Sequence, residues 1–263
     1  MTSEQWPTAD EVRSFHQDGF VKISGVFPAE QAELLRGALA AERTAYNAGD
    51  RDDDPRYTFA RTKSVQVISN LWRIREEFAD LSVHRRLGSI AGRLGGMDRI
   101  RVYHDSMLYK DTANPPVPWH QDEYFALLDK VVTAWVALSP VSREDGAVVY
   151  ARGSHQEGLL DVRGMSDSDV TQHLRAKGHA FRCPDMAAGD VLFHAGTVFH
   201  RSDRNVTGVP RYAFTAFFFE DGKRLRPQPF GTELVDLVYF PGRAVGDIAD
   251  SPFNPVVFGR GNP

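Results

Sequence analysis

The spacing of hydrophobic and polar residues divides the chain into a helical part and a part built from short strands. Before about residue 99, stretches rich in Ala, Leu, Glu and Arg predict helices over 29–46 and 74–94. An earlier, shorter helix is predicted by Thr8 and Glu11, which match a capping box, and by Gly19, which would end it. We therefore expect a helix-rich N-terminal part.

After residue 99, short segments rich in β-branched and aromatic residues alternate with clusters of Gly, Pro, Asn and Asp. The predicted strands, with one earlier strand included, are Phe20–Ile23, Ile100–Tyr109, Val131–Leu138, Ala147–Ala151, His179–Cys183, Asp190–His194 and Arg211–Glu220. Many short strands after helices favour a mostly β sandwich or jelly roll with flanking helices. We expect one domain over 1–263, made of a helix-rich part (1–98), a jelly-roll core (99–220) and a wrapping tail (221–263).

Composition narrows the possible partners. The net charge is −4 and the pI is about 6.1, so no basic field favours nucleic acid or an anionic membrane. No apolar run of membrane-spanning length is present, and residues 1–7 lack the features of a secretory signal. The single cysteine, Cys183, excludes an intrachain disulfide and is typical of a reducing compartment. We expect a cytoplasmic protein with a small-molecule partner; the sequence carries no signal for an oligomeric state.

The most informative segment is 118–125, Pro-Trp-His-Gln-Asp-Glu-Tyr-Phe. In a strand, alternate residues share a face, so His120 and Asp122 would reach one point. Two histidines and one carboxylate on one face of a metal leave open positions, which is the arrangement of non-haem Fe(II) oxygenases. The third ligand must come from a distant strand, and the candidates are His155, His194 and His200.

A nearby arginine separates the last two candidates, because such an oxygenase also holds an anionic cosubstrate. Arg211 opens an apolar strand eleven residues after His200, and a hairpin would place the two side by side. Arg204 follows His194 by ten residues but lies in a turn-rich stretch. We therefore choose His200 and Arg211, whose guanidinium can grip a carboxylate through two hydrogen bonds. Ser202 can add a hydroxyl donor on the same face.

In combination, these residues and their flanking segments resemble one family. The matching segments are Phe15–Pro28, Trp119–Asp122, Val132–Leu138, Glu144–His155 and Gly189–His194. Together with His200 and Arg211, they resemble the phytanoyl-CoA dioxygenase family of Fe(II)- and 2-oxoglutarate-dependent oxygenases. The resemblance implies a double-stranded β-helix core. It also implies Fe(II), 2-oxoglutarate and O₂ as cofactor and cosubstrates.

The resemblance further implies roles for individual residues. His120, Asp122 and His200 would bind Fe(II), and Arg211 and Ser202 would hold the distal carboxylate of 2-oxoglutarate. Other residues on strands that line this pocket in similar proteins are Met107, Thr133 and Trp135. A basic or amide residue on an earlier strand would also contact the cosubstrate, and either Lys63 or Gln66 fits that place.

The substrate is less sharply indicated. Glu123, Tyr124 and Phe125 follow the metal motif and are expected to border the substrate. We expect a small or mid-sized biosynthetic compound that undergoes hydroxylation, desaturation or oxidative cyclisation. Asp122 argues against halogenation, because halogenating relatives lack this carboxylate. Two alternatives stay open: a cupin-like metal protein that does not use 2-oxoglutarate, and a non-catalytic β-sandwich binding protein.

Overall fold

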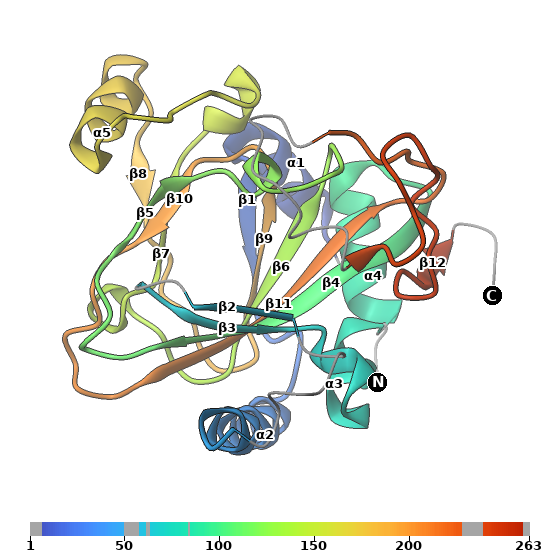
Figure 1. The fold of residues 1–263 in the computed structure, drawn as a ribbon. Helices are drawn as coiled ribbons and strands as arrows, with labels where there is room; N and C mark the ends of the chain where they lie inside the picture. The colour runs from blue at the N-terminus through green and yellow to red at the C-terminus, as the bar shows by residue number, and fades with distance from the viewer. Residues whose placement is uncertain (1–6, 50–57, 62–63, 84, 228–238, 260–263) are drawn as a thin grey trace.

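Two antiparallel sheets packed face to face form the centre of the molecule (Figure 1). The computed structural model describes residues 7–49, 58–61, 64–83, 85–227 and 239–259. The prediction of a mostly β fold with a jelly-roll type of core is confirmed.

The major sheet supplies the broad wall of the site. Its strands, in spatial order, are β1 (Phe20–Ile23), β9 (Val191–Ala195), β6 (Val132–Ala137), β11 (Arg211–Glu220), β4 (Arg99–Lys110), β3 (Gln66–Ser69) and β2 (Thr58–Arg61). One further strand, β12 (Val256–Gly259), pairs with the beginning of β4. Because directly paired residues project from the same face, the register of these strands determines which side chains face the second sheet.

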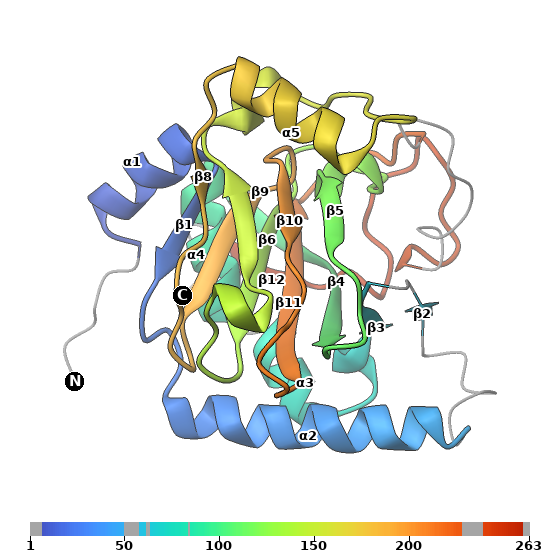
Figure 2. The ribbon, with the colours of Figure 1, turned by 90° about the vertical axis from the view of Figure 1, so that its left-hand side faces the viewer.

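The minor sheet closes the site from the other side. Its strands, in spatial order, are β5 (Val117–His120), β10 (His200–Ser202), β7 (Val148–Ala151) and β8 (Phe181–Arg182). Figure 2 shows this sheet in front of the major sheet. Trp135 and Leu192 of the major sheet pack against Val148 and Tyr150 of the minor sheet, so an apolar layer joins the two.

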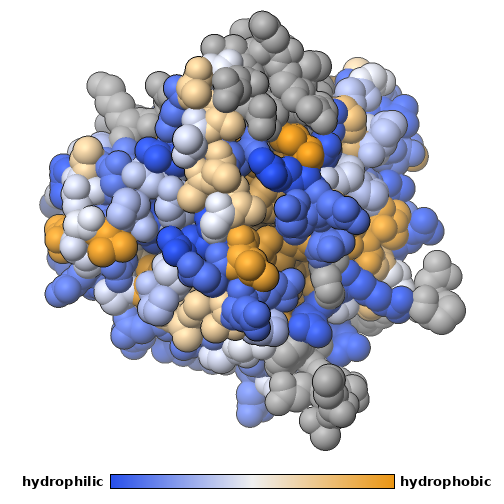
Figure 3. Space-filling view, turned by 90° about the horizontal axis from the view of Figure 1, so that it is seen from below, coloured by the Kyte–Doolittle hydropathy of each residue, from blue (hydrophilic) through white to orange (hydrophobic). Residues whose placement is uncertain are grey.

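Helices cover the outer faces of both sheets. They are α1 (Ala9–Asp18), α2 (Ala29–Asn47), α3 (Glu76–Ser82), α4 (Arg85–Gly95) and α5 (Asp167–Ala176). The first four pack against the major sheet, where Leu39, Phe78 and Leu94 share a core with Phe214. Helix α5 covers the minor sheet. On the side where α2 lies, hydrophobic residues are interspersed with hydrophilic ones (Figure 3), which fits a helix with one buried and one solvent-facing side.

The predicted helix boundaries hold at the start of the chain and fail later. In the predicted capping box, the Glu11 amide donates to Thr8 Oγ1 at 3.2 Å and the Thr8 amide donates to the Glu11 carboxylate at 2.7 Å. The single helix expected over 74–94 is wrong, because α3 ends at Ser82 and α4 begins at Arg85. Ser82 and Val83 are weaker helix formers than their neighbours, which favours a break between them.

The described part of the C-terminal tail contains a strand. β12 adds to the edge of β4, and Asn254 Nδ2 donates to the carbonyl oxygens of Val102 and Tyr103 at 3.1 and 3.0 Å. The strands β2, β3 and β12 were not expected from the sequence. All three have only four residues and therefore carry little periodic signal of their own, and β2 and β12 are edge strands. Among the described residues, no helix combines the length and hydrophobicity needed to cross a membrane.

Candidate metal and cosubstrate site

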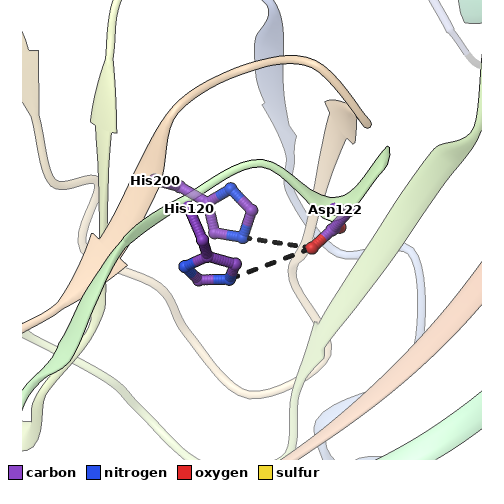
Figure 4. Close-up of side chains that lie close together, drawn as sticks. All are labelled: His120, Asp122 and His200. Atoms are coloured by element: carbon purple, nitrogen blue, oxygen red, sulfur yellow. Dashed lines mark ion pairs between the residues drawn. The ribbon is translucent and has the colours of Figure 1, made fainter. Parts of the chain in front are cut away.

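Three side chains from separate elements meet between the two sheets (Figure 4). His120 ends β5 and pairs directly with His200 on β10, while Asp122 begins the short 3-10 helix Asp122–Tyr124. Their ligand atoms all lie within 4.8 Å of one another. His120 and Asp122 were expected on one strand. In the structure the strand ends at His120, and the following turn brings Asp122 back toward both histidines.

The hydrogen bonds of both histidines direct their Nε2 atoms toward the metal position. Nδ1 of His120 lies 2.9 Å from the carbonyl oxygen of Pro118, and Nδ1 of His200 lies 3.1 Å from that of Val198. A carbonyl oxygen only accepts, so each Nδ1 carries the hydrogen. Nε2 is then the lone-pair atom, which is the form in which histidine binds a metal.

The two oxygens of Asp122 have different surroundings. Oδ2 accepts hydrogen bonds from Thr133 Oγ1 at 2.7 Å and from His194 Nε2 at 2.9 Å. The Tyr150 hydroxyl lies 3.0 Å from His194 Nδ1 and donates to it. Oδ1 lies 3.5 Å from Nε2 of His200 and 3.9 Å from Nε2 of His120. Oδ1 is therefore the oxygen that could bind a metal, and both ring nitrogens of His194 are already used in hydrogen bonds.

The protonation states follow from this contact set. Burial lowers the pKa of His120 to about 4, and the neighbouring His200 adds to the effect. Burial alone would raise the pKa of Asp122, but His200 and His194 outweigh it and hold this pKa well below its usual range. Burial lowers the pKa of His200, yet the facing Asp122 more than offsets burial and the net shift is upward. An ionised carboxylate beside imidazoles is the donor set that a divalent metal requires, and the metal would displace any imidazole proton.

The hydroxyl of Thr133 gives a first prediction. We expect Thr133→Val to weaken iron(II) binding by roughly 10- to 100-fold, because groups that orient a metal ligand typically contribute this much. Anaerobic calorimetric titration of the metal-free protein with Fe(II), without 2-oxoglutarate, measures the change. Thr171→Val is the control, since its hydroxyl contacts Trp119 on the far side of the minor sheet. Equal Fe(II) affinities in the wild type, Thr133→Val and Thr171→Val would contradict the assignment of Thr133 as a positioning residue.

A second cluster, beside the metal ligands, is positively charged and buried. Lys110 ends β4 and its Nζ lies 3.0 Å from Ser202 Oγ on β10. Arg211 pairs with Lys110 in the sheet and donates to the carbonyl oxygen of Gly146. Its guanidinium also lies 5.4 Å from the ring centre of Trp135. These four side chains define the cationic pocket: Lys110, Trp135, Ser202 and Arg211.

The cationic pocket has charge and hydrogen-bond donors without partners. Within the described chain, neither Lys110 nor Arg211 forms an ion pair with a carboxylate. Nε of Arg211 and Nε1 of Trp135 are buried and have no hydrogen-bond partner there. Asp203 and Asp145 act electrostatically on Lys110 and Arg211 but form no ion pair with them, and a buried charge without a contacting counter-ion is unfavourable. The pocket therefore fits an anionic ligand, and the carboxylates of 2-oxoglutarate match both its charge and its donors.

Two sequence expectations about this pocket need correction. Arg211 and His200 do not form a hairpin; β10 and β11 lie in opposite sheets, and Arg211 faces Ser202 across the sandwich through Lys110. Met107 does not line the pocket, because it packs with Phe78 and Phe214 on the helix-covered face. Its neighbour Ser106 lies on the inner face, in register with Thr215 and Trp135.

The amide or basic contact to the cosubstrate was left open between two residues. Gln66 faces the outer layer, where it bonds to Arg43 at 2.9 Å and to Asn47 at 3.1 Å on α2. Lys63 lies outside the described residues. The buried cation beside Ser202 is Lys110, which sequence reasoning missed. The sequence did contain a signal for this cation, because Lys110 ends an apolar strand just as Arg211 begins one.

The three residues expected to border the substrate divide into two groups. Glu123 is only 5% exposed, and its Oε1 accepts from the Val131 amide at 3.0 Å. Burial raises its pKa to about 7, and Arg226 of the tail lies 3.7 Å from Oε2. These contacts show that Glu123 fixes a loop, and its assignment to substrate binding stays a prediction. Phe125, 50% exposed, packs edge-to-face on Tyr124, and both stay candidates.

A partly accessible surface lies next to the metal ligands. His120 and Asp122 have side-chain exposures of 26% and 14% although both lie between the sheets. His104 and Phe217, on the inner face of the major sheet, are also partly exposed, whereas most residues around them in the strands are buried. We use the term hollow for the space next to these partly exposed side chains, His104, His120, Asp122 and Phe217, between the two sheets. This hollow is the space that a substrate would occupy beside the metal.

Comparison with known proteins assigns the class. The model of the family described as phytanoyl-CoA dioxygenase (PhyH) matches residues 15–213. The chain therefore belongs to the phytanoyl-CoA dioxygenase family. The predicted class, an Fe(II)- and 2-oxoglutarate-dependent dioxygenase, is confirmed.

Individual relatives differ in what they act on. The chain is 32% identical over 227 residues to 1-deoxypentalenic acid 11-beta-hydroxylase of Streptomyces arenae, with 75% of each chain covered. It is 24% identical over 192 residues to a probable alpha-ketoglutarate-dependent hypophosphite dioxygenase of Stutzerimonas stutzeri, covering 70% of this chain and 66% of that protein. Among solved structures, the non-heme alpha ketoglutarate dependent carbocyclase SnoK from nogalamycin biosynthesis has a TM-score of 0.76, 23% identity, and coverage of 95% and 96%.

Proposed function

We propose that the chain oxidises a C–H bond of a small or mid-sized natural-product substrate, using iron held by His120, Asp122 and His200. 2-Oxoglutarate would place its distal carboxylate in the cationic pocket. The observation that carries this proposal is the pair of buried cations, Lys110 and Arg211, beside a complete ligand triad and without a carboxylate partner among the described residues.

Iron with 2-oxoglutarate and O₂ supplies the oxidising power for such a reaction, and the protein supplies position and a dry site. Arg211 and Ser202 orient the cosubstrate from opposite sheets. Thr133 and His194 hold Asp122 so that one oxygen faces the metal. The apolar layer around Trp135 and Tyr150 keeps water away from the buried side.

The names of the relatives support the substrate class. A hydroxylase of 1-deoxypentalenic acid and a carbocyclase of nogalamycin biosynthesis both act on natural products. Hydroxylation and oxidative cyclisation are therefore both proposed outcomes, because the same ligand set serves either. We also propose that residues 1–263 act as one catalytic domain, since Arg226 and Tyr239 of the tail contact residues beside the site. A cytoplasmic location stays a prediction.

The test is an anaerobic titration of metal-free protein with Fe(II) and then with 2-oxoglutarate. A chelated 2-oxo acid on Fe(II) gives a broad visible charge-transfer band, which we expect to appear and saturate. Bound iron without a band would favour the cupin-like alternative that does not use 2-oxoglutarate. Failure to bind iron would favour the non-catalytic sandwich.

Lys110 provides a second prediction. We expect Lys110→Met to raise the Kd of 2-oxoglutarate by roughly 10- to 100-fold, because a hydrogen bond to a charged group contributes about 1.5–3 kcal/mol. The charge-transfer titration measures this Kd. Lys177→Met removes an exposed lysine on the opposite side of the minor sheet and is the control. An unchanged Kd in Lys110→Met would show that the lysine only supports Ser202.

The pH dependence of 2-oxoglutarate binding gives an independent test of the role of Lys110. Burial lowers its pKa to about 8, and Arg211 on β11 adds to the lowering, while Asp203 and Arg204 after β10 act in opposite directions. A bound carboxylate favours the charged lysine, so the complex needs its proton. Affinity for 2-oxoglutarate should therefore be full below pH 8 and fall above it in the wild type, with a flatter profile in Lys110→Met.

A further inference from the structure

His104 lies on the inner face of β4, in the same row of the major sheet as the residues that hold Asp122. It pairs with Phe217 on β11, Phe217 pairs with Thr133 on β6, and Thr133 pairs with His194 on β9. Residues that pair directly share a face. Thr133 and His194, at the other end of this row, both donate hydrogen bonds to Asp122. The imidazole of His104 therefore belongs to the same hollow as the metal ligands.

Two aromatic rings cover both faces of the His104 imidazole. Phe217 stacks on one face with a centroid distance of 4.2 Å and an interplanar angle of 26°. Tyr239, from the C-terminal tail, stacks on the other at 4.4 Å and 15°. Because His104 is still partly exposed, only the edge of its ring is left to face the hollow.

The hydrogen bonds of His104 determine what this edge presents. Nδ1 lies 3.3 Å from the carbonyl oxygen of Asp105 and 3.4 Å from the hydroxyl of Ser106. The carbonyl only accepts, so Nδ1 carries the hydrogen and the Ser106 oxygen can share it. Nε2 then holds a lone pair, and within the described chain it has no hydrogen-bond partner. Burial lowers the pKa of His104 to about 4, so the ring is neutral at physiological pH.

We propose that His104 is the substrate-recognising residue, and that the substrate carries a neutral hydroxyl or N–H group that donates a hydrogen bond to His104 Nε2. This inference rests on the proposed function and narrows its substrate class. An anionic group at this place would face a lone pair and, further along the row, the charge of Asp122. The stacked rings of Phe217 and Tyr239 favour an apolar, ring-containing skeleton next to the donor.

The test uses matched compounds that share a skeleton and differ at one oxygen. The probes are borneol, bornyl methyl ether and camphor, followed by the alcohol, methyl ether and ketone of decalin. Each is titrated anaerobically into protein loaded with Fe(II) and 2-oxoglutarate, and the change in the charge-transfer band gives a Kd. We expect the alcohol of at least one set to bind at least tenfold more tightly than its ether and its ketone, which corresponds to about 1.4 kcal/mol.

The variant His104→Phe removes the acceptor and keeps an aromatic ring between Phe217 and Tyr239. We expect it to form the charge-transfer band with wild-type affinity for 2-oxoglutarate and to lose the preference for the alcohol. His16→Phe makes the same change on the exposed side of α1 and should keep that preference. The coupling between the hydroxyl of the probe and His104 isolates their hydrogen bond from general effects of the substitution.

The following results would overturn the proposal for His104. They are a wild type that binds none of the alcohols, a wild type that binds alcohol and ether equally, and a preference that survives in His104→Phe. A preference for the ketone would mean that Nε2 donates, which also contradicts the proposal. Loss of the band in the wild type itself would instead refute the proposed function, so the two failures are distinguishable.

Discussion

Replacing Asp122 by alanine is expected to abolish the 2-oxoglutarate charge-transfer band and 2-oxoglutarate turnover. Asp122 is the only carboxylate in the described ligand triad, and its Oδ1 lies 3.5 Å from Nε2 of His200 and 3.9 Å from Nε2 of His120. Changes in residues that merely orient a ligand lower metal affinity by roughly 10- to 100-fold, so loss of the ligand itself should exceed about 100-fold. His120→Ala and His200→Ala should behave in the same way.

The matched control for Asp122→Ala is Asp161→Ala, because Asp161 is exposed and, among the described residues, its side chain pairs only with neighbouring Arg163. Circular dichroism and thermal unfolding separate loss of metal from loss of fold. The two sheets of Asp122→Ala should stay assembled, since Trp135, Leu192 and Tyr150 join them without this carboxylate. A folded Asp122→Ala protein that binds iron with wild-type affinity would exclude His120, Asp122 and His200 as the metal site.

Replacing Arg211 by methionine should weaken 2-oxoglutarate binding by roughly 30-fold to several thousandfold. Removing one member of a buried, hydrogen-bonded charge pair typically costs about 2–5 kcal/mol, and each 1.36 kcal/mol is a factor of ten. Arg211 is only 4% exposed, and its Nε–H group has no hydrogen-bond acceptor among the described residues. The charge-transfer titration measures the Kd, while calorimetry with Fe(II) alone should show unchanged metal affinity.

Two companion variants sharpen the Arg211 result. Arg211→Lys keeps the charge and loses the planar pair of donors, so its Kd should lie between those of the wild type and Arg211→Met. Arg163→Met removes an exposed arginine and should change nothing. If Arg211→Met bound 2-oxoglutarate as the wild type does, the cationic pocket would not be the cosubstrate site, and the cupin-like alternative would gain support.

These variants act on different parts of one assembly. Asp122 and Thr133 affect the metal, Lys110 and Arg211 affect the cosubstrate, and His104 affects the substrate. Although Lys110 and His104 both lie on β4, the three groups contact different partners, so their effects on iron, 2-oxoglutarate and substrate affinity should be separable. An effect of His104→Phe on iron binding, for example, would mean that the row from His104 to His194 is coupled through Phe217.

Several features could be predicted from the sequence because they depend on local chemistry. The capping box at Thr8 and Glu11 involves residues three apart, and the structure has both of its hydrogen bonds. The long strands β4 and β11 carry enough apolar residues to be recognised individually. The choice of His200 over His194 also agrees with the described geometry, since His194 Nε2 is occupied by Asp122 Oδ2.

Other expectations failed where the outcome depended on distant parts of the chain. Periodicity shows that neighbouring residues of a buried strand face opposite sides, but it does not show which side faces the site. For that reason Met107 was assigned to the pocket, whereas Ser106 and Lys110 face it. The sequence likewise does not show that Val131 and Arg226 contact the carboxylate of Glu123.

The sequence by itself determined the kind of chemistry: a histidine–carboxylate motif, a distant histidine and an arginine on an apolar strand, in a chain of short strands and flanking helices. Only the tertiary structure decided which buried cation accompanies Arg211, which oxygen of Asp122 is left for a metal, and that His104 faces the same hollow. The physical reason is that ligand type is a property of single residues. Which groups become buried together depends on the packing of two sheets whose contacts join residues far apart in the chain.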